Sequence, residues 1–177
     1  MRSAVVLSGS VVAALAASAN ADFFVVAGMG DYMSTGTVGT VIQGMMSETL
    51  TVNVGPYTFA TSAGTLDIDT GSNPDSVSGS LVFTDGGGDT ITISLSGSAF
   101  GTGSQFATAA GTWTMTSGTG AFSAFSGSGT WNTALFFQTA GSDKAMSMSK
   151  FGGDLVPAPG AAALMALGGL VAIRRRR

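Results

Sequence analysis

The feature that most constrains the fold of this chain is a period-two alternation of apolar residues with Ser, Thr, Asn or Asp. It runs through residues 50–54, 66–69 and 91–95. Residues two apart in a strand share a face, so the alternation predicts strands with one buried side. The Ser and Thr residues suit strands and are expected to face water.

Further alternating segments follow the same pattern and bring the number of predicted strands to between eight and ten. Asp85 and Asp89 bracket three glycines, a composition typical of a hairpin loop. No stretch between Asp22 and Val156 carries a helical stripe. The other candidate strands are residues 77–83, the segments around Trp113 and Trp131, residues 135–137 and the segment holding Met146 and Met148.

Short strands at spacings of about 8 to 12 residues predict an all-β fold, an antiparallel barrel or sandwich. Closure into a barrel would remove strand edges that a Ser/Thr-rich surface protects poorly. Gly-Thr-Trp occurs at residues 111–113 and again at 129–131, which suits two successive strands joined by a turn at 118–120. The aromatic residues of this half either fill the core or line a ligand pocket: Trp113, Phe122, Phe125, Trp131, Phe136 and Phe137.

The N-terminal segment has the pattern of a secretory signal peptide. Arg2 precedes an apolar run over residues 4–19, and Ala19-Asn20-Ala21 forms an A-x-A exit. We therefore predict a signal helix over residues 1–21 that is cleaved after Ala21, and a core domain over residues 22–155.

The C-terminal segment, residues 156–177, combines three elements. Val156-Pro157-Ala158-Pro159-Gly160 is followed by an apolar stretch that ends at Ile173 and then by Arg174, Arg175, Arg176 and Arg177. The prolines are expected to stop the preceding structure. The apolar stretch predicts a short transmembrane helix that the arginines would hold on the cytoplasmic side.

This tail resembles the PEP-CTERM sorting signal of bacteria that make extracellular polysaccharide. The departure is Ala158, where the family usually has Glu. The resemblance implies recognition by an exosortase-type membrane protease after export, with transient anchoring in the inner membrane. The expected location is the cell surface, the outer membrane or the extracellular space, and the expected partners are the export machinery, that protease and extracellular polysaccharide.

Composition excludes several kinds of chemistry. The chain has no Cys and no His, which removes disulfides, thiolate nucleophiles, the commonest general base and the commonest metal ligand. All ten acidic residues lie in the core, where Lys144 and Lys150 are the only bases, so its formal charge is −8. A core without a basic patch does not suit nucleic acid.

The most acidic segment offers a candidate metal site. Asp67, Asp69 and Asp75 could supply oxygen ligands to calcium, although the spacing is not that of an EF-hand. The alternatives are a solvated acidic strand face that leads into a turn, or an acid/base pair made by Asp67 and Asp69. No other cofactor is predicted.

Residues 89–131 are similar to a second family, the allene-oxide-cyclase-like barrels, through the segments at 111–114, 118–122 and 127–130. That resemblance implies a closed, lipocalin-type barrel of eight strands and transfers no catalytic residue. The leading hypothesis for function is a non-enzymatic structural or adhesive module. The alternatives are a lipocalin-like carrier or cyclase, and a calcium-dependent binding module.

Overall fold

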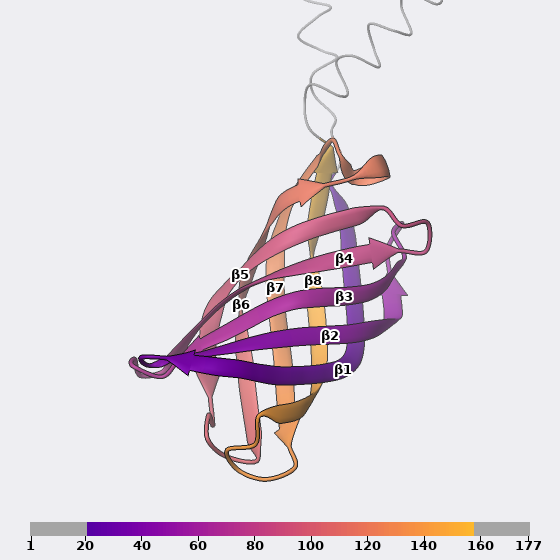
Figure 1. Cartoon of the computed structure of the whole chain (residues 1–177). Helices are drawn as coiled ribbons and strands as arrows, with labels where there is room; N and C mark the ends of the chain where they lie inside the picture. The colour runs from indigo at the N-terminus through magenta and orange to yellow at the C-terminus, as the bar shows by residue number, and fades with distance from the viewer. Residues whose placement is uncertain (1–20, 158–177) are drawn as a thin grey trace, which may run out of the picture.

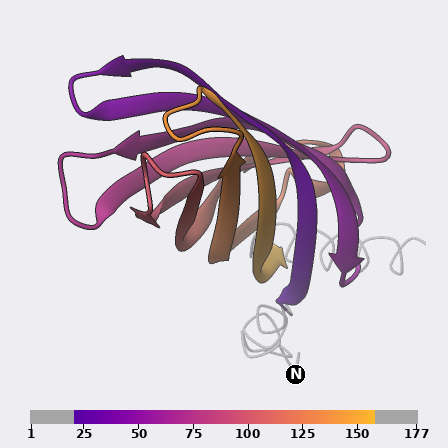
Figure 2. The same ribbon diagram turned by 90° about the horizontal axis from the view of Figure 1, so that it is seen from below.

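A computed structural model describes residues 21–157 and places them in eight antiparallel strands that close into a barrel. Each strand pairs with the next in sequence, and β8 pairs back with β1 (Figures 1 and 2). The strands are β1 (Asp22–Val38), β2 (Val41–Val54), β3 (Phe59–Asp69), β4 (Asp75–Asp85), β5 (Thr90–Phe100), β6 (Phe106–Gly118), β7 (Phe125–Phe137) and β8 (Lys144–Pro157). The predicted all-β fold is confirmed, and of the two predicted architectures the structure has the barrel.

The helical content of the described residues is a single 3₁₀ turn, η1 (Gly120–Phe122), between β6 and β7. No helix in this part of the chain is both long enough and apolar enough to cross a membrane. The predicted signal helix and C-terminal helix lie outside the described residues. Of the two predicted terminal segments, only Ala21, Val156 and Pro157 are described.

The strands are longer than the alternating segments suggested, between 11 and 17 residues. Glycines within them allow close approach of neighbouring backbones and so do not interrupt pairing. At Gly30, for example, a Cβ atom would lie 1.9 Å from the carbonyl oxygen of Ser47 on β2. The strand β8 also continues through Val156 and Pro157, which pair with Ser126 and Phe125. The strand thus ends at Pro157, the first of the prolines expected to stop it, two residues beyond the predicted end of the core domain.

Aromatic side chains fill the half of the barrel that holds the chain ends. Phe59 stacks on Phe122, which η1 presents across this end, and Phe24 packs on both Phe59 and Trp113. Of the six aromatic residues expected in the core, Trp113, Phe122 and Trp131 are buried, Phe125 and Phe137 are partly buried, and Phe136 is exposed. Sequence patterning missed the buried Phe24, Tyr32 and Phe151, whereas the buried Phe83 ends the predicted strand 77–83.

A β-bulge explains one local error of the strand pattern. Ala27 pairs with Val52 while Gly28 pairs with Leu50, so Thr51 is the extra residue. The bulge moves the following side chains to the opposite face: Leu50 is buried, whereas Val52 is 49 % exposed. The simple alternation over residues 50–54 had placed both on one face.

Candidate functional site

The outer face of β7, β8 and β1 carries a groove of about 490 Å³. We call it the Gly152 groove because Gly152 lies at its centre, paired with Thr130 on β7 and Val25 on β1. Its outward-facing walls are Ser128, Thr130 and Asn132 from β7, Lys150 and Asp154 from β8, and Phe23 and Val25 from β1.

The groove exists because β8 has no side chain at Gly152, between the outward-pointing side chains of Thr130 on β7 and Val25 on β1. The ideal Cβ position on Gly152 meets nothing closer than Val25 Cγ2 at 3.5 Å, so the space above it is open. Phe23 on the rim is 57 % exposed. The groove therefore combines an exposed phenyl ring with hydroxyl, amide, ammonium and carboxylate groups, and it presents no buried general base.

The adjacent residue, Gly153, faces the barrel interior and supports the groove from below. Its Cβ position would lie 2.6 Å from Trp113 Cζ2, and that of Gly129 would lie 2.7 Å from Trp113 Nε1. The Trp113 indole N–H donates to the carbonyl of Gly152 at 3.2 Å. The indole thus fixes the backbone that forms the floor of the groove.

A second hollow, the mouth pocket, lies at the barrel end opposite the chain ends and has a volume of about 200 Å³. Tyr32, Ile42, Ile68 and Phe137 form its apolar part, and hydroxyls such as those of Thr102 and Ser142 lie at its rim. The Tyr32 hydroxyl is buried and has no hydrogen-bond partner. Burial, together with the nearby Asp67 carboxylate, raises the pKa of Tyr32 to about 12, so the phenol is neutral.

A buried polar cluster lies inside the barrel between the mouth pocket and the aromatic half. Ser149 Oγ donates to Glu48 Oε1 at 2.7 Å and lies 2.7 Å from Thr133 Oγ1, and Ser62 Oγ donates to Glu48 Oε2 at 3.4 Å. Glu48 is 2 % exposed. The two lysines of the described chain, Lys144 and Lys150, lie on the outside of β8, so no lysine neutralises this carboxyl group.

The sequence-predicted calcium residues have separate partners. Asp67 accepts from the Gly44 N–H at 3.2 Å and Asp75 accepts from Thr102 Oγ1. Asp69 accepts from Thr40 Oγ1 at 2.5 Å and from the Gly71 N–H at 2.9 Å. These two hydrogen bonds, that from Thr40 first, hold the pKa of the exposed Asp69 carboxyl below its ordinary value.

No group of three acidic side chains within residues 21–157 is arranged to hold a metal ion. The geometry therefore gives the calcium hypothesis no support, and it stays a prediction. Its test is a rise in melting temperature with added calcium that Asp67→Asn with Asp69→Asn abolishes.

Of the sorting residues, Val156 and Pro157 lie in β8, whereas Ala158, Pro159, Gly160 and Arg174 to Arg177 lie outside the described residues. Ala21 directly precedes β1, and Ala19 also lies outside. Sequence reasoning missed Gly152, Tyr32 and Glu48. The available signal was Gly152-Gly153 inside an alternating strand, since paired glycines there mark close approach or an open surface.

Comparisons with known proteins add little to this geometry. No protein-family model matches the chain, and no curated protein matches it. One solved structure with a similar fold is that of the pterocarpan synthase dirigent protein GePTS1, at 12 % identity and a TM-score of 0.45, covering 89 % of this chain and 97 % of that one. Similarity at this level carries no argument about function, which has to rest on the residues of this chain.

Proposed function

We propose that this chain is an exported, non-enzymatic barrel module that holds extracellular polysaccharide at the cell surface or in the surrounding matrix. The observation that carries the proposal is the Gly152 groove, an open hollow walled by one exposed phenyl ring from β1 and by polar side chains of β7 and β8. The signal-like and PEP-CTERM-like ends are the features that favour export and sorting.

The chemistry of the groove suits a sugar better than an apolar ligand. A pyranose ring presents an apolar face of C–H groups, which can pack on an aromatic ring such as that of Phe23. Its hydroxyls both donate and accept hydrogen bonds, and Asn132, Thr130 and Ser128 offer matching groups. Lys150 and Asp154 balance each other in charge, which favours a neutral or weakly charged polymer.

The packing of the barrel favours an outer binding surface over an internal one. A carrier for a drug-sized molecule needs a cavity of roughly 300 Å³ or more. In this barrel Trp113, Phe24 and Phe59 occupy the half that holds the chain ends, and the Glu48 cluster lies next to them. The mouth pocket, at about 200 Å³, is smaller than such a carrier requires.

The proposal is tested by retention of the exported protein on a column of matrix polysaccharide purified from its native host. Gly152→Leu should abolish retention by filling the groove, and Phe23→Ala should weaken it. Gly86→Ala is the matched control, because a Cβ atom there meets nothing within 4 Å in the β4–β5 loop. Retention of the Gly152→Leu variant equal to that of the wild type would refute the groove as the binding site.

A second candidate function, a carrier for a small molecule, is favoured by one observation at the mouth pocket. A buried hydroxyl without a partner is unfavourable, and a bound ligand with one polar group would satisfy that of Tyr32. The ligand class is a small neutral alcohol, ketone or phenol. Such compounds should raise the melting temperature of the wild type and leave that of Tyr32→Phe unchanged; an equal rise in both would exclude this role.

A further inference from the structure

In the first part of β8, serines face the barrel interior and methionines face outward, which is the reverse of the expectation that Ser and Thr face water. Ser147 and Ser149 point into the barrel and are buried, whereas Met146 and Met148 point outward. The outside of the neighbouring strands β1 and β2 carries three more methionines. Five of the seven methionines in the described chain are thus exposed by between 43 and 54 % on three adjacent strands: Met29, Met33, Met45, Met146 and Met148.

Three of these side chains are placed as a triangle. Met29 on β1 pairs directly with Met148 on β8, which sets their Cβ atoms about 5 Å apart. Met146 is two residues from Met148 on the same face, roughly 7 Å away. Because Met146 pairs with Asp31, it is the diagonal neighbour of Met29, within reach of long side chains at roughly 7–8 Å.

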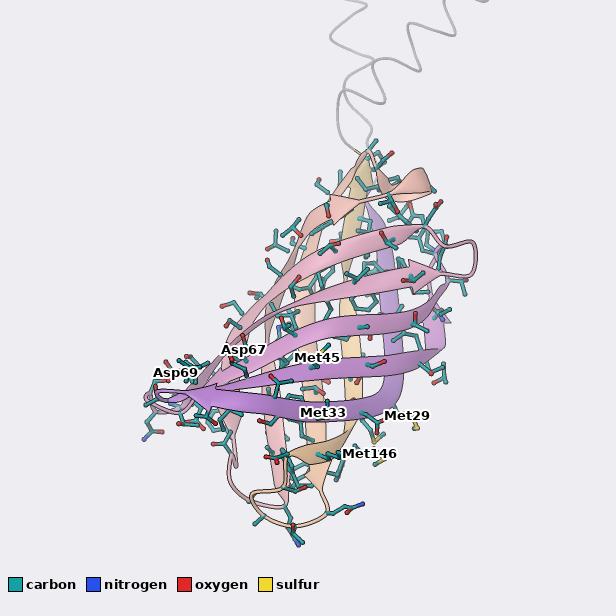
Figure 3. All side chains as sticks on the ribbon, in the orientation of Figure 1. Met29, Met33, Met45, Asp67, Asp69 and Met146 are labelled. Atoms are coloured by element: carbon teal, nitrogen blue, oxygen red, sulfur yellow. The ribbon has the colours of Figure 1, made fainter. Side chains whose placement is uncertain are left out.

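Figure 3 shows Met29 and Met146 extending from the same side of the barrel. A methionine side chain has three rotatable bonds, so three sulfurs on this triangle can converge on one point. The neighbouring charged groups are Asp31, which pairs with Met146, and two lysines of β8. Lys144 lies two residues before Met146, and Lys150 lies two residues after Met148.

We propose that Met29, Met146 and Met148 form a surface site for a soft monovalent metal ion, Cu(I). Thioether sulfur is a soft donor that prefers Cu(I) to Zn²⁺, Mg²⁺ or Ca²⁺. The chain has no Cys and no His, so methionine is its only strong soft ligand. The thioether is uncharged, so the single positive charge of Cu(I) is opposed by no ligand charge and faces Asp31 as well as Lys144 and Lys150.

The proposal implies an unusual pH dependence. Thiolate and imidazole sites weaken in acid because protons compete with the metal for the ligand. A thioether has no proton to release, so Cu(I) affinity should be the same at pH 3.5 as at pH 7.5, a range over which ordinary carboxyl groups become protonated. A decline on acidification would instead indicate carboxylate ligands such as Asp31 and would overturn the assignment.

The direct test is an anaerobic titration of the full chain with Cu(I) in competition with a chromophoric Cu(I) chelator. The triple variant Met29→Leu, Met146→Leu and Met148→Leu keeps side-chain volume and apolar character. It should lose one bound ion, or lose affinity by about tenfold or more, as expected for removal of soft ligands. The matched control Met33→Leu with Met45→Leu, on the same outer face, should retain both.

X-ray absorption at the copper edge should detect sulfur neighbours in the wild type and not in the triple variant. Circular dichroism confirms that each variant is folded. Equal Cu(I) binding by the triple variant and the wild type would overturn the proposal. A loss confined to the Met33/Met45 variant would do the same.

Discussion

Tyr32 occupies an unfavourable environment for a phenol, because its hydroxyl has lost the hydrogen bonds that water would provide. Its hydroxyl is buried and unpartnered, and its ring lies against Gly44, where a Cβ atom would lie 2.3 Å from Tyr32 Cε2. Gly44 therefore makes room for the phenol. The Tyr32 ring is thus closely packed while its hydroxyl lacks a hydrogen bond. This combination suits a pocket in which a ligand supplies the missing hydrogen bond.

Removing that hydroxyl is expected to stabilise the unliganded protein. Tyr32→Phe keeps the ring and abolishes the unsatisfied group, so the free energy of unfolding at neutral pH should rise by about 1 kcal/mol. Urea denaturation measures this change directly. A decrease of similar size would mean that the hydroxyl has a partner, for example an internal water.

The same residue predicts loss of stability in alkali. Its pKa is about 12 in the folded protein, against an ordinary value near 10. The folded state thus favours the protonated phenol, and its contribution is complete below pH 10 and is lost as the pH rises toward 12. Burial and the hydrogen bond to Asp22 also raise the pKa of Tyr57 to about 12. Tyr57 therefore loses its contribution to stability over the same pH range. Melting temperature should fall over this range, and less steeply in Tyr32→Phe; identical slopes would contradict the assignment.

Glu48 supplies a second test at the scale of a single residue. Burial of a carboxylate without a cationic partner is costly. Glu48→Gln retains an oxygen acceptor for Ser149 and should leave the melting temperature at pH 7.5 unchanged or raised. Glu48→Leu leaves the hydroxyls of Ser149 and Ser62 without their acceptor and should cost about 1–3 kcal/mol. A Gln variant clearly less stable than the wild type would show that the charge itself is stabilising.

At the scale of elements, adjacent glycines of β8 have opposite roles. Gly153 faces inward against Trp113 and the Ser128 carbonyl, whose oxygen would lie 2.3 Å from an added Cβ, whereas Gly152 faces the open groove. Gly153→Ala should therefore destabilise by about 1–3 kcal/mol through overpacking. Gly152→Ala, the matched control, should change stability little. Thermal denaturation of both variants checks this, and equal effects would contradict the described orientation of β8.

Much of the element pattern could be predicted from sequence because apolar alternation reports which strands exist. The β4–β5 hairpin between Asp85 and Thr90 and the two Gly-Thr-Trp strands, β6 and β7, are confirmed. The faces of individual residues could not all be predicted. A bulge at Thr51 inverts the end of β2. On β8 the buried Ser149 hydrogen-bonds to Glu48 and Thr133, contacts with distant strands that local patterning does not contain.

The candidate sites were harder to predict than the fold. The composition of the acidic segment suggested a calcium site. In the structure, however, Asp67, Asp69 and Asp75 each accept hydrogen bonds from different residues. The Gly152 groove depends on a residue that lacks a side chain, and the methionine triangle depends on the register between β1 and β8. Register between the first and last strands of a barrel is a property of closure, which a linear pattern does not report.

At the scale of the whole molecule, both terminal segments attach to one end of the barrel. Asp22 at the start of β1 pairs with Leu155 near the end of β8, and the mouth pocket opens at the other end. An anchor attached at Pro157 would place the aromatic-filled end toward the membrane and the mouth away from it. The Gly152 groove lies on the side of the barrel, where a polymer could reach it.

We propose that the terminal segments deliver the barrel and that the barrel alone acts outside the cell. Mass spectrometry of the mature protein isolated from its native host tests that claim most directly. The account predicts a chain that begins at Asp22 and ends close to Pro157. An exported form that still carries Arg177 would contradict it.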